Sequence, residues 1–197
     1  MRRMFGLLAL TAMAACQPKP AVMTDAQRAA LADTVKTFAL SMVDKMNKGD
    51  MQGSMASYTQ DASGRFTENG VMNDPAGMQK SNQDMMGMME SMQIKPTKVD
   101  VIVLGPDAAV VNSPFSMTVK TKAGKEVTGQ GVWTGVVQRQ AGAWRVVSTH
   151  ESDVNAEDMM KAMMAPPAKA AKGKAAAAKA PAKAPAKASA KSTTKKK

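Results

Sequence analysis

Apolar residues recur every three or four positions between Thr24 and Gly49, which is the period of one face of an α-helix. Thr24 and Gln27 have the spacing of a capping box at the start of this segment, and Gly49 ends it. The apolar positions are Leu31, Val35, Phe38, Met42 and Met46. The pattern therefore predicts one long amphipathic helix.

Three weaker segments follow before the pattern changes. Asp50 is a suitable N-cap for a short helix that carries Tyr58 on its apolar side and ends near Asp61. Residues 63–72 indicate a strand, and a third helix is predicted from about residue 74 to residue 92. The methionines near the end of the globular part suggest a last helix.

After residue 97 the chain favours strands. Four segments rich in valine, threonine and aromatic residues are separated by glycine-containing turns: 98–104, 108–122, 126–140 and 144–152. The turns at 122–125 and 140–143 are short enough for hairpins, so antiparallel pairing is expected. Gly129, Gly131 and Gly135 mark places where a strand bends or a helix approaches closely. Helices followed by these strands predict an α+β fold, in which a curved antiparallel β-sheet wraps around N-terminal helices.

The N-terminus has the layout of a secretory signal. Two arginines precede an apolar run over residues 4–10, which is too short to span a bilayer, and small residues lead up to Cys16. The segment Met13-Ala14-Ala15-Cys16 resembles the lipobox of bacterial lipoproteins, which implies removal of a signal peptide over residues 1–15 and lipid on Cys16. By resemblance to the sorting rules of lipoproteins in Gram-negative bacteria, Gln17 in place of aspartate implies anchoring at the outer membrane, facing the periplasm. The alternative is an ordinary signal peptide with an incidental cysteine.

A linker over residues 16–23 and a domain over residues 24–164 precede a tail of different composition. Residues 165–197 contain ten lysines and no acidic residue, and these lysines account for all but one unit of the net charge of +11. With no large apolar residue to bury, this C-terminal tail is expected to be disordered. In the cell envelope its partner would be an anionic polymer or lipid, and its lack of aromatic residues argues against nucleic acid. The alternative is a solvating tether without a fixed partner.

Two motifs resemble the nuclear transport factor 2-like superfamily, also called SnoaL-like or ketosteroid-isomerase-like. Residues 47–62, from Asn47-Lys48-Gly49-Asp50 to Tyr58-Thr59-Gln60-Asp61-Ala62, are similar to its first two helices. Residues 142–147, Gly142-Ala143-Trp144-Arg145-Val146-Val147, are similar to its last strand. The resemblance covers roughly residues 24–153. It implies a cone-shaped, cystatin-like α+β fold that encloses a pocket.

The resemblance also implies which residues line the pocket and which chemistry is missing. The pocket-lining residues would be Phe38, Met42, Tyr58, Phe66, Trp133 and Trp144. Ketosteroid isomerases use a carboxylate base, a tyrosine and a buried acid, whose positions would fall near Phe66, Met42 and Val136. None of those groups is present there, so this isomerase chemistry is not expected. The same fold serves catalysis, binding and association, so fold alone does not define function.

His150 is the only histidine and the first candidate for chemistry. If the last strand alternates, His150 shares a face with Trp144, where it could titrate or bind a ligand. Asp61, Glu68 and Glu151 are its candidate acidic partners. The alternative is a buried neutral histidine held by a backbone hydrogen bond. Without a second histidine or a free cysteine, no zinc or thiol site is expected, and no cofactor is predicted.

Methionine is heavily used, with 20 residues in the chain. The predicted third and last helices carry two clusters: Met85, Met86, Met88, Met89 and Met92, and Met159, Met160, Met163 and Met164. Thioethers on one helical face are soft ligands suited to Cu(I), but methionine also fills apolar cores. Packing is favoured because neither cluster has a histidine or cysteine beside it.

Three functions follow as hypotheses. The first is a non-enzymatic envelope lipoprotein whose pocket binds a small apolar molecule or whose sheet forms a homodimer. The second is a SnoaL-like enzyme that transfers a proton on a small hydrophobic substrate through His150, with Asp61 or Glu151. The third is Cu(I) binding by the methionine clusters.

Overall fold

The computed structural model describes residues 22–165. The predicted signal peptide, Cys16 and the tail from residue 166 onward therefore lie outside the described residues. The described helices and strands begin at Asp25 and end at Met164. None of the helices in this part of the chain is long and apolar enough to cross a membrane.

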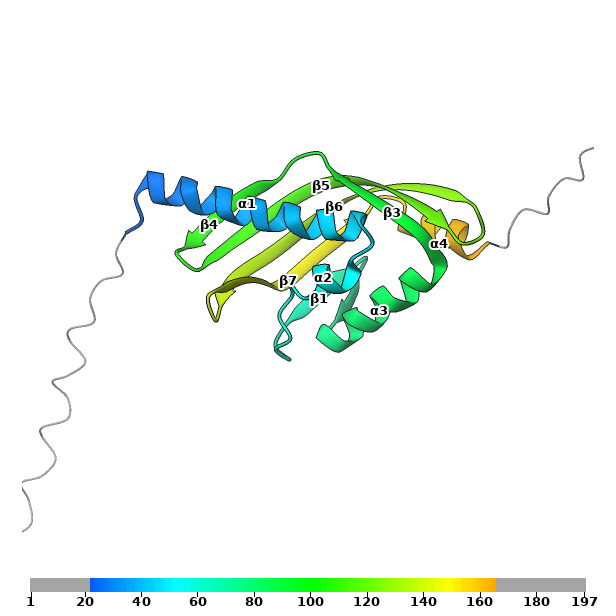
Figure 1. Cartoon of the computed structure of the whole chain (residues 1–197), viewed down its shortest axis with the longest axis horizontal. Helices are drawn as coiled ribbons and strands as arrows, with labels where there is room; N and C mark the ends of the chain where they lie inside the picture. The colour runs from blue at the N-terminus through cyan, green and yellow to red at the C-terminus, as the bar shows by residue number, and fades with distance from the viewer. Residues whose placement is uncertain (1–21, 166–197) are drawn as a thin grey trace, which may run out of the picture. The chain divides into compact units, whose positions relative to one another are not determined.

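The predicted first helix is confirmed as α1 (Asp25–Asn47). Its capping box is complete, because the Thr24 hydroxyl accepts a hydrogen bond from the Gln27 N–H at 3.2 Å and the Gln27 side chain accepts one from the Thr24 N–H at 2.9 Å. Val35 and Met42 on its apolar face are buried. The helix lies across the sheet and packs against β3, β4 and β5 (Figure 1).

The second helix, α2 (Met51–Met55), is capped by Asp50 as predicted but ends before Asp61. The segment after it leaves the helix to pair with the sheet. The Val146 N–H donates to the Ser57 carbonyl oxygen at 2.9 Å, and the Thr59 N–H donates to the Val146 carbonyl oxygen at 2.8 Å. These bonds satisfy backbone groups that a longer helix would have used, and they hold Tyr58 against β7.

Seven strands form one curved, unclosed sheet in the order β2-β1-β7-β6-β5-β3, with β4 also paired to β5. The strands are β1 (Arg65–Glu68), β2 (Val71–Asn73), β3 (Met89–Pro96), β4 (Asp100–Gly105), β5 (Ala108–Thr121), β6 (Glu126–Gln140) and β7 (Ala143–Asp153). The hairpins between β5, β6 and β7 are antiparallel, as predicted. The sheet is nevertheless mixed, because β1 pairs with β7 in parallel. The α+β fold is therefore confirmed, with one pair of strands that was not foreseen.

The single strand predicted over residues 63–72 is wrong. Two short strands, β1 and β2, form a hairpin there, and Asn69 and Gly70 turn it with φ values of 48° and 85°. Asn-Gly is the preferred pair for a two-residue hairpin turn because both residues tolerate positive φ. The prediction of a single strand relied on the spacing of apolar residues and overlooked this turn signal.

The predicted third helix is also too long. α3 (Pro75–Met88) begins after the Asp74 N-cap, but Met89 and Met92 belong to β3. In β3, Met92 pairs with Val119 of β5, and both side chains are buried with Met89. Methionine favours helices, but pairing with β5 ends this helix at Met88 and places Met89 in a strand.

The expected last helix is present as α4 (Ala156–Met164). Its Met159 is buried against β6, where a side chain at Gly129 would collide with the Met159 sulfur. Gly129 therefore allows α4 to pack closely against β6, and close approach of a helix is one of the two roles predicted for this glycine. α4 lies at the end of the sheet away from the turn between β6 and β7 (Figure 1).

Candidate functional site: an apolar pocket with a carboxylate cluster

A cavity of about 450 Å³ lies between the sheet and the helices. Its lining is mainly apolar, and eleven methionines contribute to it: Met42, Met46, Met51, Met55, Met78, Met85, Met92, Met117, Met159, Met160 and Met163. Both predicted methionine clusters supply residues to this lining. Met85 and Met163 also pack against the buried group formed by Met89, Met92 and Val119. Unbranched, polarizable side chains suit an adaptable apolar wall.

Four of the six predicted lining residues face the cavity: Met42, Tyr58, Phe66 and Trp133. The rings of Tyr58 and Phe66 meet edge to face with centroids 5.4 Å apart. Phe38 and Trp144 lie instead in the core around Val35 and Val146. Trp144 is buried there, and the Arg139 guanidinium lies 4.9 Å from its ring centroid.

A β-bulge in β7 decides which side chains reach the pocket. Val137 of β6 pairs with Val146, whereas Val136 pairs with Ser148, so Val147 is an extra residue in β7. One extra residue reverses the alternation of every side chain that follows it. Thr149, Glu151 and Asp153 therefore line the pocket.

His150 is consequently on the opposite face from Trp144, contrary to simple alternation. It is exposed, and its Nε2 lies 3.1 Å from the Ser152 hydroxyl. Asp61 is exposed in the loop after α2, where its carboxylate accepts a hydrogen bond from the Ser63 N–H at 2.8 Å, which lowers the pKa of Asp61. Of the three proposed catalytic residues, only Glu151 lines the cavity.

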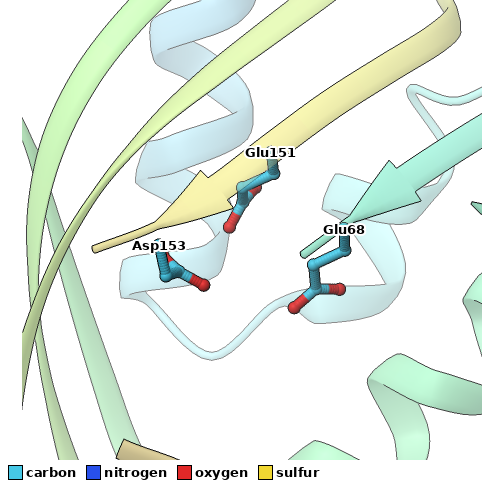
Figure 2. Close-up of side chains that lie close together, drawn as sticks. All are labelled: Glu68, Glu151 and Asp153. Atoms are coloured by element: carbon cyan, nitrogen blue, oxygen red, sulfur yellow. The ribbon is translucent and has the colours of Figure 1, made fainter. Parts of the chain in front are cut away.

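Three carboxylates that line the pocket lie close together. Glu68, Glu151 and Asp153 each place a carboxylate oxygen within 4.8 Å of the others. Figure 2 shows Glu151 and Asp153 extending from β7 and Glu68 from the neighbouring β1, with their carboxylates turned toward a common space. The parallel register sets Glu68 directly beside Glu151.

Asn69 fixes the third member of this cluster. Its side-chain amide donates to Asp153 Oδ2 at 2.9 Å, and its side-chain oxygen accepts from the Asp153 N–H at 2.8 Å. The Asn69 N–H also donates to the Glu151 carbonyl oxygen at 2.9 Å. The tight turn between β1 and β2 thus anchors the end of β7 and orients Asp153.

Burial and mutual repulsion disfavour the charged forms of this cluster. Burial raises the pKa of Glu151 to about 8, and the charges of Glu68 and Asp153 add to the effect. Burial, followed by the charge of Asp153, also raises the pKa of Glu68. Burial and the charge of Glu151 raise the pKa of Tyr58 well above its ordinary value. Among the described residues that line the pocket, none is lysine, arginine or histidine.

From the sequence, Glu68 and Glu151 were predicted only as acidic partners of His150, and Asp153 was not predicted to be a site residue. The spacing of Glu151 and Asp153 indicates a shared face, which was a usable signal. The bulge at Val147 and the parallel pairing of β1 with β7 left no comparable mark in the sequence. Together these two features assemble the cluster.

A curved sheet that packs against helices and leaves an apolar pocket between them is typical of a class of small α+β ligand-binding and catalytic domains. Residues 35–157 match the family model described as the SnoaL-like domain. This chain therefore belongs to the SnoaL-like domain family, with the fold of the NTF2-like superfamily. None of the curated proteins matches the sequence.

Solved structures share the fold at low sequence identity. A candidate scytalone dehydratase from Novosphingobium aromaticivorans is 9% identical over 67% of this chain and 89% of its own, with a TM-score of 0.59. A candidate dehydratase of the NTF2-like family from Streptomyces avermitilis is 21% identical over 64% of this chain and 98% of its own, with a TM-score of 0.57. The hexachlorocyclohexane dehydrochlorinase LinA-type3 from Novosphingobium barchaimii is 14% identical over 66% and 91%, with a TM-score of 0.56.

Proposed function

We propose that this domain binds a small, mostly apolar molecule in the pocket between its helices and its sheet. The observation that carries the proposal is a cavity of about 450 Å³ with a mainly apolar lining and a cluster of three carboxylates. That combination of size and lining is typical of sites for small organic ligands. Methionines from α1, α3 and α4 provide a wall that can adapt to the shape of a guest.

Occupation of the cavity can be tested with N-phenylnaphthylamine, a neutral dye whose fluorescence rises in an apolar site. Ala39 of α1 lines the pocket, and Ala39→Phe should fill part of it and weaken dye binding about tenfold. Ala26→Phe, at an exposed position of the same helix, is the matched control and should bind the dye normally. Equal binding by both variants, with unchanged thermal unfolding, would place the dye elsewhere and contradict the proposal.

A second candidate function, proton transfer, is supported by Glu151. Its carboxyl faces an apolar cavity, and its pKa of about 8 lets it both donate and accept a proton near neutral pH. Proteins of the same fold include one named as a dehydrochlorinase. The role first proposed for His150 would pass to Glu151, because His150 is exposed on the opposite face. Deuterium exchange at the carbon beside the carbonyl of a bound apolar ketone should then disappear in Glu151→Gln.

A further inference from the structure

We propose that the ligand of this pocket carries a protonated amine beside its apolar body, and that Glu68, Glu151 and Asp153 bind the ammonium group. The inference rests on the proposed binding function and specifies its ligand class. It depends on three independent features of the pocket: uncompensated negative charge, unpartnered acceptor atoms and neighbouring aromatic rings.

Within residues 22–165, the negative charge of the cluster has no counter-ion. Glu68 and Glu151 lie side by side across the β1–β7 pair, and like charges in such positions destabilise a sheet. None of the ion pairs formed within residues 22–165 involves these two residues or Asp153. The titratable groups beside Glu151 are Tyr58 and Glu68 from other segments and Asp153 from the same strand, and each is neutral or acidic. A cation from outside the protein would remove this repulsion.

Among the described residues, the cluster also has too few hydrogen-bond donors for its acceptor atoms. Asp153 Oδ1 is buried and has no partner, although Oδ2 of the same residue is bonded to Asn69. Within the described part of the chain, no side-chain hydrogen bond is made to the Glu151 carboxylate, which is largely removed from solvent and lines the cavity. Buried acceptors are normally satisfied, because leaving one unpaired costs about 1–3 kcal/mol. An ammonium group supplies both the charge and the N–H donors that are missing.

Aromatic rings beside the carboxylates favour an organic cation over a metal ion. Trp133 pairs with Glu151 across β6 and β7, and the Tyr58 and Phe66 rings line the same cavity. Cations are attracted to the faces of such rings, and ammonium ligands are commonly recognised this way. A calcium ion would instead require six to eight oxygen ligands. Methionine and aromatic side chains supply a large part of the surrounding wall.

Three probes of nearly equal size and different charge test the inference by calorimetric titration of the full chain at neutral pH. They are phenylbutylamine, phenylbutanol and phenylbutyrate. We expect the amine to bind at least about tenfold more tightly than the alcohol, and the carboxylate to bind most weakly. Glu151→Gln should abolish the preference for the amine over the alcohol. Glu126→Gln makes the same substitution at an exposed position outside the pocket and should keep the preference.

The possible outcomes distinguish a failure of this inference from a failure of the proposed binding function. If the alcohol binds as tightly as the amine, the pocket still binds apolar molecules but the ammonium assignment is wrong. If no probe binds, the proposed function itself fails. Calcium chloride is the last probe. If calcium binds, the amine does not, and Glu151→Gln abolishes calcium binding, the cluster is a metal site. That result would overturn the inference.

Discussion

Glu151 occupies a position that is electrostatically unfavourable for a carboxylate. It lies beside Glu68 in the sheet, close to Asp153, and at the edge of an apolar cavity. A glutamine would fit the same space without repulsion. The presence of an acid there indicates that a charge or a proton at this site has a use.

The raised pKa of Glu151 predicts that stability falls as pH rises. Glutamate ordinarily titrates at 4.5, whereas Glu151 titrates at about 8 in the folded chain. Between these values the folded state holds a proton that the unfolded state has released, so the free energy of unfolding decreases with increasing pH. Below pH 4.5 both states are protonated and the penalty is absent. The full penalty above pH 8 should be about 2–4 kcal/mol, allowing for partial exposure of the side chain.

Urea unfolding at pH 5 and pH 8 measures this effect. Glu151→Gln should unfold at nearly the same urea concentration as the native chain at pH 5, and at a higher one at pH 8. Glu126→Gln should retain the native decline with pH. A smaller slope from Glu68 should persist in Glu151→Gln, because burial also raises the pKa of Glu68. An identical decline in the native chain and in Glu151→Gln would show that Glu151 is ionised in the folded state.

At the scale of elements, local signals predicted most of the fold. The capping box of α1, the caps of α2 and α3, and the glycine turns between β5, β6 and β7 depend on residues adjacent in sequence. The boundary between α3 and β3 depends on pairing with a strand about thirty residues later, which no local pattern reveals. The parallel pairing of β1 with β7 likewise connects distant segments.

The candidate site was less predictable than the fold because it depends on one irregular residue. Val147 is apolar, like its neighbours in β7, and nothing in its type indicates a bulge. Regular alternation places His150 in the pocket, whereas the bulge places Glu151 there. Pocket residues before the bulge or on other elements, such as Met42 and Trp133, were predictable because their local period is unbroken.

Gly131 of β6 should be essential for the close pairing of β6 with β7. A Cβ atom at this position would lie 2.8 Å from the Ser152 carbonyl oxygen, 2.8 Å from Phe115 Cζ and 2.7 Å from Asp153 Oδ1. A backbone carbonyl in a paired strand cannot move aside easily, so Gly131→Ala should reduce the free energy of unfolding by about 1–3 kcal/mol. It should also weaken ligand binding, because Asp153 belongs to the carboxylate cluster.

Gly87→Ala provides a matched control for this substitution. Gly87 is an exposed residue of α3, and a Cβ atom there would meet nothing within 4 Å. Alanine at an exposed helical position should stabilise the chain by about 0.5–1 kcal/mol. Chemical denaturation of both variants measures the opposite signs. If Gly131→Ala unfolds with the same free energy as the native chain, β7 can shift without a loss of stability. The carboxylate cluster would then tolerate the displacement of Asp153.

At the scale of the whole molecule, charge is divided between the domain and the sequence that follows it. The pocket concentrates carboxylates, whereas residues 166–197 carry ten lysines. The sequence predicts two means of attachment to a membrane, lipid on Cys16 and the basic tail. A polybasic segment contributes attraction to anionic lipids that salt weakens, whereas a lipid chain contributes about 0.8 kcal/mol for each buried CH₂ group.

We propose that the lipid on Cys16 dominates, and fractionation of bacteria that express the chain tests this. Native protein should enter the detergent-rich phase on detergent phase separation, and its mass should include a diacylglyceryl group. Cys16→Ser should move to the aqueous phase, whereas a chain that ends at residue 165 should stay with the detergent, because it keeps the lipid. High salt should release neither lipidated form, since apolar burial is insensitive to screening. Retention of Cys16→Ser on membranes at low salt, with release by high salt, would instead assign attachment to the lysines.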